Sequence, residues 1–128
     1  MTLRKNVETT LPGGDSTPVE WATMGGNTLY TASIPIRADG SIDDGDIESQ
    51  TRLTLENLKS ILASAGGTMD DVTQVQVYLT SKEYFSGMNE VYRTFFNEPY
   101  PNRATVIADL MVPGAKIEIV VHAHIETK

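Results

Sequence analysis

Residues 101–108 read PNRATVIA, and residues 116–125 read KIEIVVHAHI. Both runs are rich in β-branched residues, which favours strands, and Pro113-Gly114 provides a turn between them. Arg103 lies near the start of the first strand, and Glu118 lies inside the second, which we expect to be its neighbour in the sheet. A guanidinium holds a carboxylate or phosphate with two parallel hydrogen bonds, and a nearby carboxylate can orient water or move a proton. The pair predicts either a small site for an anionic metabolite or a structural ion pair, and both interpretations stay open on these two residues alone.

The rest of the chain alternates between strand and helix patterns. Apolar residues at helical spacing predict one helix that starts at Asp46 and ends at Gly66-Gly67, and a second helix capped by Ser81. Runs of β-branched and aromatic residues predict strands over 19–24, 28–34, 72–79, 103–111 and 116–125, and the mixed residues 3–9 are compatible with an edge strand. The order is β-β-α-β-α-β-β with an edge strand in front. It predicts an α+β fold in which two helices cover one face of a single sheet.

The last strand indicates what happens at the other face of this sheet. Its two sides carry Ile117, Ile119, Val121, Ala123 and Ile125 on one, and Glu118, Val120, His122 and His124 on the other. No helix remains to cover the second side, although it also carries an apolar residue. We therefore expect another subunit to cover it.

Composition limits the classes of function. The 128 residues favour one domain over 1–128, and a chain this short has little room for a deep pocket of its own. A net charge of -7 argues against nucleic acid and anionic membranes as partners. The absence of cysteine excludes disulfides and thiolate nucleophiles. No apolar run is long enough to span a membrane, and no signal-peptide pattern is present, so we expect a cytoplasmic protein.

No pattern predicts a metal site. His122 and His124 share one strand face, but zinc needs three or four converging ligands, so packing or surface roles are the better interpretation. Residues 43–46, Asp-Asp-Gly-Asp, lack the ligand alternation and the terminal glutamate of a calcium loop. We interpret that segment as a turn followed by a helix cap.

Four parts of the chain resemble the RidA/YjgF family of small trimeric proteins. They are residues 45–59, residues 70–80, residues 88–96, and the pair 101–106 with 117–119. The resemblance covers nearly the whole chain. It implies a chorismate-mutase-like α+β fold, a homotrimer around a central barrel, and active sites in the clefts between subunits. It also implies hydrolysis of reactive enamines and imines to keto acids and ammonia, without metal or organic cofactor.

The resemblance also implies roles for individual residues. Arg103 would hold the carboxylate of the substrate, and Glu118 would orient the water or move its proton. Asn89 matches an asparagine near the family's cleft, and a solvated position on the helix surface is an equally good interpretation of it. Thr105 occupies the position where the family often has cysteine, and we include it among the substrate-binding candidates.

The chain departs from the family pattern where substrate is expected to bind. Val19 stands where many relatives have a tyrosine, and Trp21, two residues later on the same predicted strand, is a candidate for the missing aromatic wall. The segment Ala32-Ser33-Ile34-Pro35 is one residue shorter than the family's Ser-Gly-Gln-Ile-Pro. After a shift of one residue, Ser33 would supply the expected hydroxyl.

Several functions therefore remain to be compared. The first is a general enamine and imine deaminase, and a narrower form is a catabolic deaminase for aminoacrylate- or aminomuconate-like compounds. The second is a trimer that binds a keto acid for regulation and performs no turnover. The third is RNA cleavage, an activity sometimes attached to the family, and a pI near 4.7 argues against it.

Overall fold

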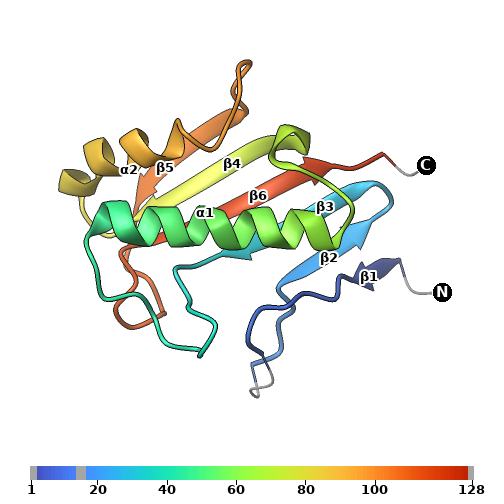
Figure 1. The fold of residues 1–128 in the computed structure, drawn as a ribbon, viewed down its shortest axis with the longest axis horizontal. Helices are drawn as coiled ribbons and strands as arrows, with labels where there is room; N and C mark the ends of the chain where they lie inside the picture. The colour runs from blue at the N-terminus through green and yellow to red at the C-terminus, as the bar shows by residue number, and fades with distance from the viewer. Residues whose placement is uncertain (1–2, 14–16, 127–128) are drawn as a thin grey trace.

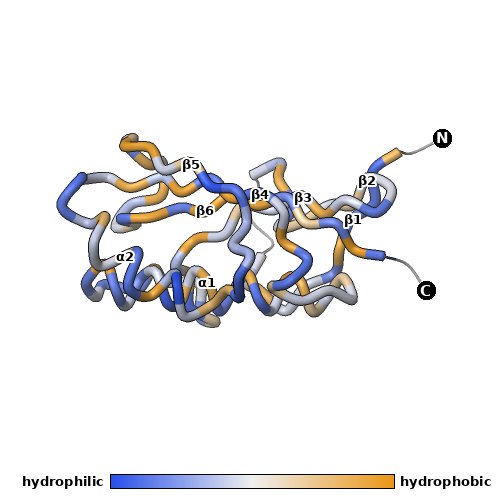
Figure 2. Tube along the Cα trace, turned by 90° about the horizontal axis from the view of Figure 1, so that it is seen from above, coloured by the Kyte–Doolittle hydropathy of each residue, from blue (hydrophilic) through white to orange (hydrophobic). Residues whose placement is uncertain are grey.

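The computed structural model describes residues 3–13 and 17–126. Its six strands form one sheet in the order β1-β2-β3-β6-β4-β5, with two α-helices packed on one side (Figures 1 and 2). The elements are β1 (Arg4–Asn6), β2 (Ala22–Gly25), β3 (Thr28–Ser33), α1 (Ile47–Ser64), β4 (Val72–Leu79), α2 (Phe85–Tyr92), β5 (Asn102–Ile107) and β6 (Ile117–His124), with short 3-10 turns at Met69–Asp71 and Lys82–Tyr84. The predicted α+β fold with two helices on one face is confirmed.

Helix α1 begins and ends where the sequence predicts. The Asp46 side chain accepts a hydrogen bond from the Ser49 N–H at 2.9 Å, which satisfies one of the free donors of the first turn. At the other end Gly66 adopts a positive φ of 85°, a conformation that favours glycine and stops the helix. The helix buries one apolar stripe against the sheet, formed by Leu55, Leu58, Ile61 and Leu62.

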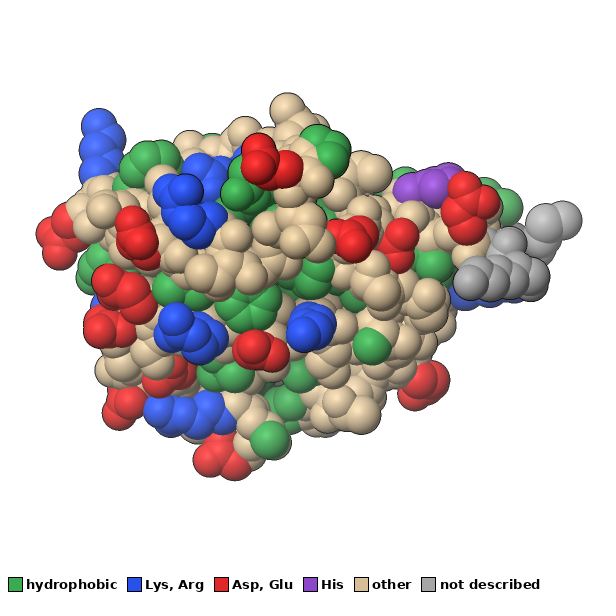
Figure 3. Space-filling view, turned by 45° about the horizontal axis from the view of Figure 1, so that its top comes forward, with side chains coloured by type: hydrophobic (Ala, Val, Ile, Leu, Met, Phe, Trp, Pro, Cys, Tyr) green, Lys and Arg blue, Asp and Glu red, His purple; other side chains and the backbone are tan. Residues whose placement is uncertain are grey.

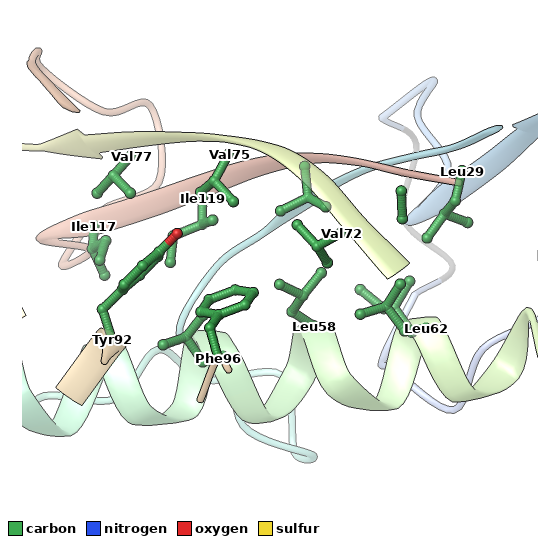
Figure 4. Close-up of a cluster of buried hydrophobic side chains, with 14 of the residues drawn as sticks. Leu29, Leu58, Leu62, Val72, Val75, Val77, Tyr92, Phe96, Ile117 and Ile119 are labelled. Atoms are coloured by element: carbon green, nitrogen blue, oxygen red, sulfur yellow. The ribbon is translucent and has the colours of Figure 1, made fainter. Parts of the chain in front are cut away.

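The core lies between the helices and the sheet. In β6, Ile117, Ile119 and Val121 are completely buried, whereas the residues between them are only half-buried. This alternation is the one predicted for the last strand. Figure 4 shows Ile117 and Ile119 from this strand facing the helix layer, which contributes Leu58 and Leu62 from α1, Tyr92 from α2 and Phe96 from the turn that follows α2.

Several predicted boundaries are wrong. The edge strand considered over 3–9 covers only Arg4–Asn6. Ser81 caps a 3-10 turn, because its hydroxyl accepts from the Glu83 N–H at 3.3 Å, and α2 begins only at Phe85. β5 ends at Ile107 and not at residue 111, since Ile107 pairs with Leu79, the last residue of β4. Residues 19–21 precede β2, whose pairing with β3 starts at Ala22.

The strand order also corrects one expectation. β5 and β6 are not neighbours, because β4 lies between them and pairs with both. β4 and β5 are parallel, so the chain must cross over between them, and α2 is part of that crossover. β6 then pairs with the other edge of β4 in the antiparallel sense.

No helix among residues 3–13 and 17–126 covers the face of the sheet opposite α1 and α2 (Figure 2). We call it the open face. By strand alternation it carries the side chains of Tyr30, Val106, Glu118, Val120 and His122, among others. Tyr30 and Val106 are each 46% exposed, which is high for large apolar residues at the middle of strands. Within residues 3–13 and 17–126, no helix has the length and apolar character needed to cross a bilayer.

Candidate functional site

Arg103 is the second residue of β5, and its side chain lies on the helix side of the sheet. Its guanidinium carbon is 4.6 Å from the centre of the Tyr92 ring and 5.8 Å from that of Phe85. Its Nη1 lies 3.8 Å from the sulfur of Met88. Rings and a thioether hold a cation in place without neutralising it. In the part of the chain that the structure describes, no carboxylate lies within ion-pair distance of Arg103.

A hollow of about 310 Å³ opens beside this guanidinium. α2 and the residue after it form one wall, and the segment that leads into β5 forms the other. The lining residues are Asn89, Tyr92, Arg93, Tyr100, Pro101 and Arg103. Two of them are arginines and none is acidic, so the charge of the hollow suits an anionic ligand. We call it the Arg103 pocket.

Tyr92 forms the floor beneath the Arg103 guanidinium. Its side chain points from α2 toward the sheet, close to Ile117 and Ile119 (Figure 4). Burial raises the pKa of Tyr92 to about 12, and the nearby Arg103 opposes this effect only in part. The phenol is therefore neutral near pH 7, and it offers Arg103 the face of its ring without competing with an anionic ligand.

Glu118 lies outside the Arg103 pocket. It pairs with Tyr78 of β4, and its side chain is on the open face, whereas Arg103 is on the helix side. The structural ion pair considered from the sequence is therefore excluded within one chain, and so is a direct contact between the two groups across one substrate. Partial burial raises the pKa of the Glu118 carboxyl. A half-buried carboxyl with a raised pKa is suited to accept a proton at the edge of a site.

Of the other predicted residues, Asn89 and Thr105 lie near Arg103. Asn89 lines the Arg103 pocket, and its side-chain amide makes no hydrogen bond with residues 3–13 or 17–126. Thr105 follows Arg103 by two residues in β5, so it shares the helix side of that strand, and it pairs with Val77 of β4. It does not belong to the pocket lining.

Ser33 is not available to a ligand in this chain, which corrects the expectation that it supplies a site hydroxyl. It is completely buried, and its hydroxyl donates to the carbonyl of Thr54 in α1 at 2.8 Å. Its partner in the sheet is Ile119, so its side chain faces the helices. Its role here is to tie β3 to α1.

Trp21 and Val19 directly precede β2, which lies toward the opposite edge of the sheet from β5 and the Arg103 pocket. The strands β3, β6 and β4 separate β2 from β5. The Trp21 indole N–H donates to the Pro12 carbonyl at 2.9 Å, and Val19 is 72% exposed. Within one chain neither residue can form a wall beside Arg103.

The described residues hold no group of three or more histidine, aspartate or glutamate side chains arranged to bind a metal ion. His122 packs edge-on against Tyr30, with ring centres 5.1 Å apart, which agrees with the packing role predicted for it. A second hollow of about 230 Å³ adjoins the Arg103 pocket at Pro101, and its lining includes Asp70 and Glu98. These two acids make it less suited to an anion.

Arg93 and Tyr100 also line the Arg103 pocket, although neither is predicted from the sequence. Arg93 is four residues after Asn89, and residues four apart share one face of a helix. That spacing was the available signal for Arg93. Tyr100 lies in the irregular segment between α2 and β5, where no periodicity indicates the direction of a side chain.

Comparison with known proteins agrees with the fold. A family model described as endoribonuclease L-PSP matches residues 18–125. The mitochondrial protein mmf2 of Schizosaccharomyces pombe is 37% identical over 105 residues, which is 80% of this chain and 83% of mmf2.

Two crystal structures are similar over nearly their whole length. The structure of RidA from a Psychrobacter species has a TM-score of 0.87 and 28% identity, and the match covers 94% of this chain and 99% of that one. TdcF of E. coli, determined with bound serine, has a TM-score of 0.85 and 32% identity, with coverage of 95% and 99%.

Proposed function

The chain belongs to the RidA/YjgF family, and from this membership we propose that it hydrolyses reactive 2-imino acids and their enamine tautomers to 2-oxo acids and ammonia. The observation that carries the proposal is the environment of Arg103. Its guanidinium is held by the Tyr92 ring and opens into a pocket lined by no carboxylate. A planar cation without an anionic partner is suited to bind the carboxylate of a small organic acid.

In the proposed reaction Arg103 binds the substrate carboxylate through two parallel hydrogen bonds, which fixes the adjacent imine carbon. Water adds to that carbon as Glu118 takes one of its protons and passes it to the imine nitrogen, which gives a carbinolamine. The proton of the new hydroxyl then moves to the nitrogen, the C–N bond breaks as the C=O bond forms, and ammonia leaves with both protons of the water. Positioning and one proton-relaying carboxyl are enough for an imine, which already hydrolyses readily. The mechanism therefore uses no metal and no organic cofactor.

Arg103 and Glu118 act on the same substrate only if they come from different subunits. In one chain they lie on opposite faces of the sheet and two strands apart. We therefore propose a homotrimer in which the open face of one subunit brings Glu118 toward the Arg103 pocket of the next. The exposed apolar side chains of Tyr30 and Val106 support burial of the open face.

The serine bound to TdcF supports a small amino-acid-like ligand. Serine carries a carboxylate next to a carbon that bears nitrogen, the same arrangement as in a 2-imino acid. We transfer only this chemical class to the present chain, because the chain differs from the family pattern at Val19 and around Ser33.

The proposal is tested with an imine generated by an amino-acid dehydratase while semicarbazide competes for it. The purified protein should accelerate formation of the 2-oxo acid at the expense of the semicarbazone. Arg103→Ala should reduce the acceleration at least 10- to 100-fold, the loss expected for charge-assisted hydrogen bonds. Arg52→Ala, on the exposed face of α1, is the matched control and should keep the activity. Failure to accelerate the hydrolysis of any of several imino acids would contradict the proposal.

Other outcomes would select the other functions. Calorimetric binding of a 2-oxo acid without any effect on imine hydrolysis would indicate a regulatory binding trimer. RNA cleavage is disfavoured because the net charge is -7, and the face in Figure 3 mixes acidic and basic side chains without a broad basic surface. Degradation of RNA by the pure protein, lost in Arg103→Ala, would nevertheless select it.

The cytoplasm remains the proposed compartment. One relative, mmf2, is named as a mitochondrial protein, so members of the family occur elsewhere as well. Microscopy of the full chain fused to a fluorescent protein would decide between these locations.

A further inference from the structure

The Arg103 pocket contains a second cation that the proposed reaction does not use. Arg93 follows the last residue of α2, and its backbone N–H donates to the Asn89 carbonyl at 3.1 Å, which continues the helical geometry. Asn89 and Arg93 therefore lie side by side on one face, and both line the pocket that Arg103 enters from β5. The end of α2 and the start of β5 thus each contribute an arginine to the lining of the same hollow.

Neither arginine is neutralised by the described part of the chain. The only ion pairs within residues 3–13 and 17–126 are those of Arg37 with Asp43 and Asp44. Acidic residues outnumber basic ones by 17 to 10 in the sequence, so carboxylates are plentiful, yet none lines this pocket. An uncompensated pair of cations in such an acidic chain indicates a ligand that brings its own negative charges.

A single carboxylate that forms two parallel hydrogen bonds with Arg103 leaves the guanidinium of Arg93 without an anionic partner. The remaining polar side-chain groups of the pocket are the Asn89 amide and the hydroxyls of Tyr92 and Tyr100, and none of them is a carboxylate. We propose that Arg93 binds a second carboxylate, so that the preferred substrates are 2-imino acids of dicarboxylic type. This inference rests on the proposed function, because it takes Arg103 as the group that binds the carboxylate next to the imine.

The test compares two stable analogues of the reaction products, 2-oxobutyrate with one carboxylate and 2-oxoglutarate with two. Calorimetry on the full chain should give a dissociation constant for 2-oxoglutarate about tenfold lower, the effect of one charge-assisted contact at an exposed arginine. In Arg93→Gln the ratio of the two constants should fall close to one. Arg52→Gln, an exposed arginine on α1, should keep the wild-type ratio. Because Arg93 is exposed, added salt should also reduce the ratio.

Equal affinity for the two acids in the wild-type protein would overturn the inference and leave the proposed function intact. A preference for 2-oxoglutarate that survives in Arg93→Gln would also overturn it, because another group would then bind the second carboxylate. Failure of both acids to bind would contradict the proposed function, and the inference with it. Circular dichroism of Arg93→Gln checks that the exposed substitution leaves the fold unchanged.

Discussion

At the scale of single residues, the shape of the Arg103 side chain matters as much as its charge. Its guanidinium carbon lies 4.6 Å from the centre of the Tyr92 ring, a contact that leaves N–H groups for a ligand. A lysine keeps the charge but loses both the fork and the stacking. We expect Arg103→Lys to lower kcat/KM for imine hydrolysis about 10-fold or more. The semicarbazide competition assay measures this loss, and full activity in the lysine variant would mean that charge alone is sufficient.

We expect Glu118 to give the proposed activity an acid limb. Burial raises the pKa of its carboxyl above the ordinary value of 4.5, so the carboxylate that accepts the proton is lost at a higher pH than usual. The ratio of catalysed to uncatalysed hydrolysis should therefore fall as the pH drops through this raised pKa. In Glu118→Gln the ratio should be low and free of this limb. A variant that retains the limb would assign it to another group.

The raised pKa of Glu118 also affects the free energy of unfolding. Activity is expected to fall at low pH, whereas the stability contributed by this group falls at high pH. The folded chain binds the Glu118 proton more tightly than the unfolded chain does, so this group favours folding at low pH and opposes it once the pH exceeds the folded-state pKa. Glu118→Gln removes this opposition. At neutral pH it should therefore raise the urea midpoint slightly, and the difference should disappear below the ordinary glutamate pKa. An equal shift at both pH values would mean that the titration of Glu118 is not its cause.

At the residue scale, only some positions of the site residues could be predicted from the sequence. Alternation along the last strand correctly separates Glu118 from the core residues. The partner of Arg103, in contrast, depends on how α2 packs against β5, which no local pattern reveals. Ser33 was placed in the site because its neighbours resemble a family motif, but the face of β3 that it occupies is set by pairing with Ile119. A shift of one residue reverses the face of a strand, so a shortened motif is a weak guide there.

At the scale of elements, Gln50 joins α1 to the start of β6. It is completely buried, its amide N–H groups donate to the carbonyls of Asp43 and Gly114, and its carbonyl accepts from the Lys116 N–H. These three bonds are 2.7 to 2.9 Å long. They fix the position of Lys116, which immediately precedes β6 and lies two residues before Glu118.

We expect Gln50→Leu to lower the free energy of unfolding by about 2 to 4 kcal/mol, because it leaves buried backbone groups without partners. Urea denaturation at a fixed protein concentration measures this change, and Glu56→Gln on the exposed side of α1 is the control. A loss below about 0.5 kcal/mol would mean that water replaces the amide. Imine hydrolysis should fall with stability only if the loosened β6 displaces Glu118.

The elements themselves were largely predictable, whereas their arrangement was only partly so. The apolar stripe and the caps of α1 are local signals, and local signals fix where a helix begins and ends. The place of β4 between β5 and β6 follows from a parallel crossover through α2. Consecutive strands are usually neighbours, and that expectation failed for β5 and β6.

At the scale of the whole molecule, the open face and the separation of Arg103 from Glu118 lead to one prediction. If each site takes Arg103 from one subunit and Glu118 from the next, a chain that lacks Arg103 and a chain that lacks Glu118 can together form an intact site. Arg103→Ala chains and Glu118→Gln chains should each be inactive as pure assemblies. After they are unfolded together and refolded, mixed trimers should contain some sites with both residues intact, and activity should return to a fraction of the wild-type value.

The assembly itself is checked in parallel. Sedimentation should give the wild-type protein a mass of three chains of 14.0 kDa. Val120→Lys, which places a charge on the open face, should shift the protein toward smaller species and abolish activity while α1 and α2 keep their helical signal. A monomeric wild-type protein would exclude shared sites. A trimer without complementation would instead mean that each substrate is served by residues of one subunit, and Glu118 would then need a role other than proton acceptor for the ligand at Arg103.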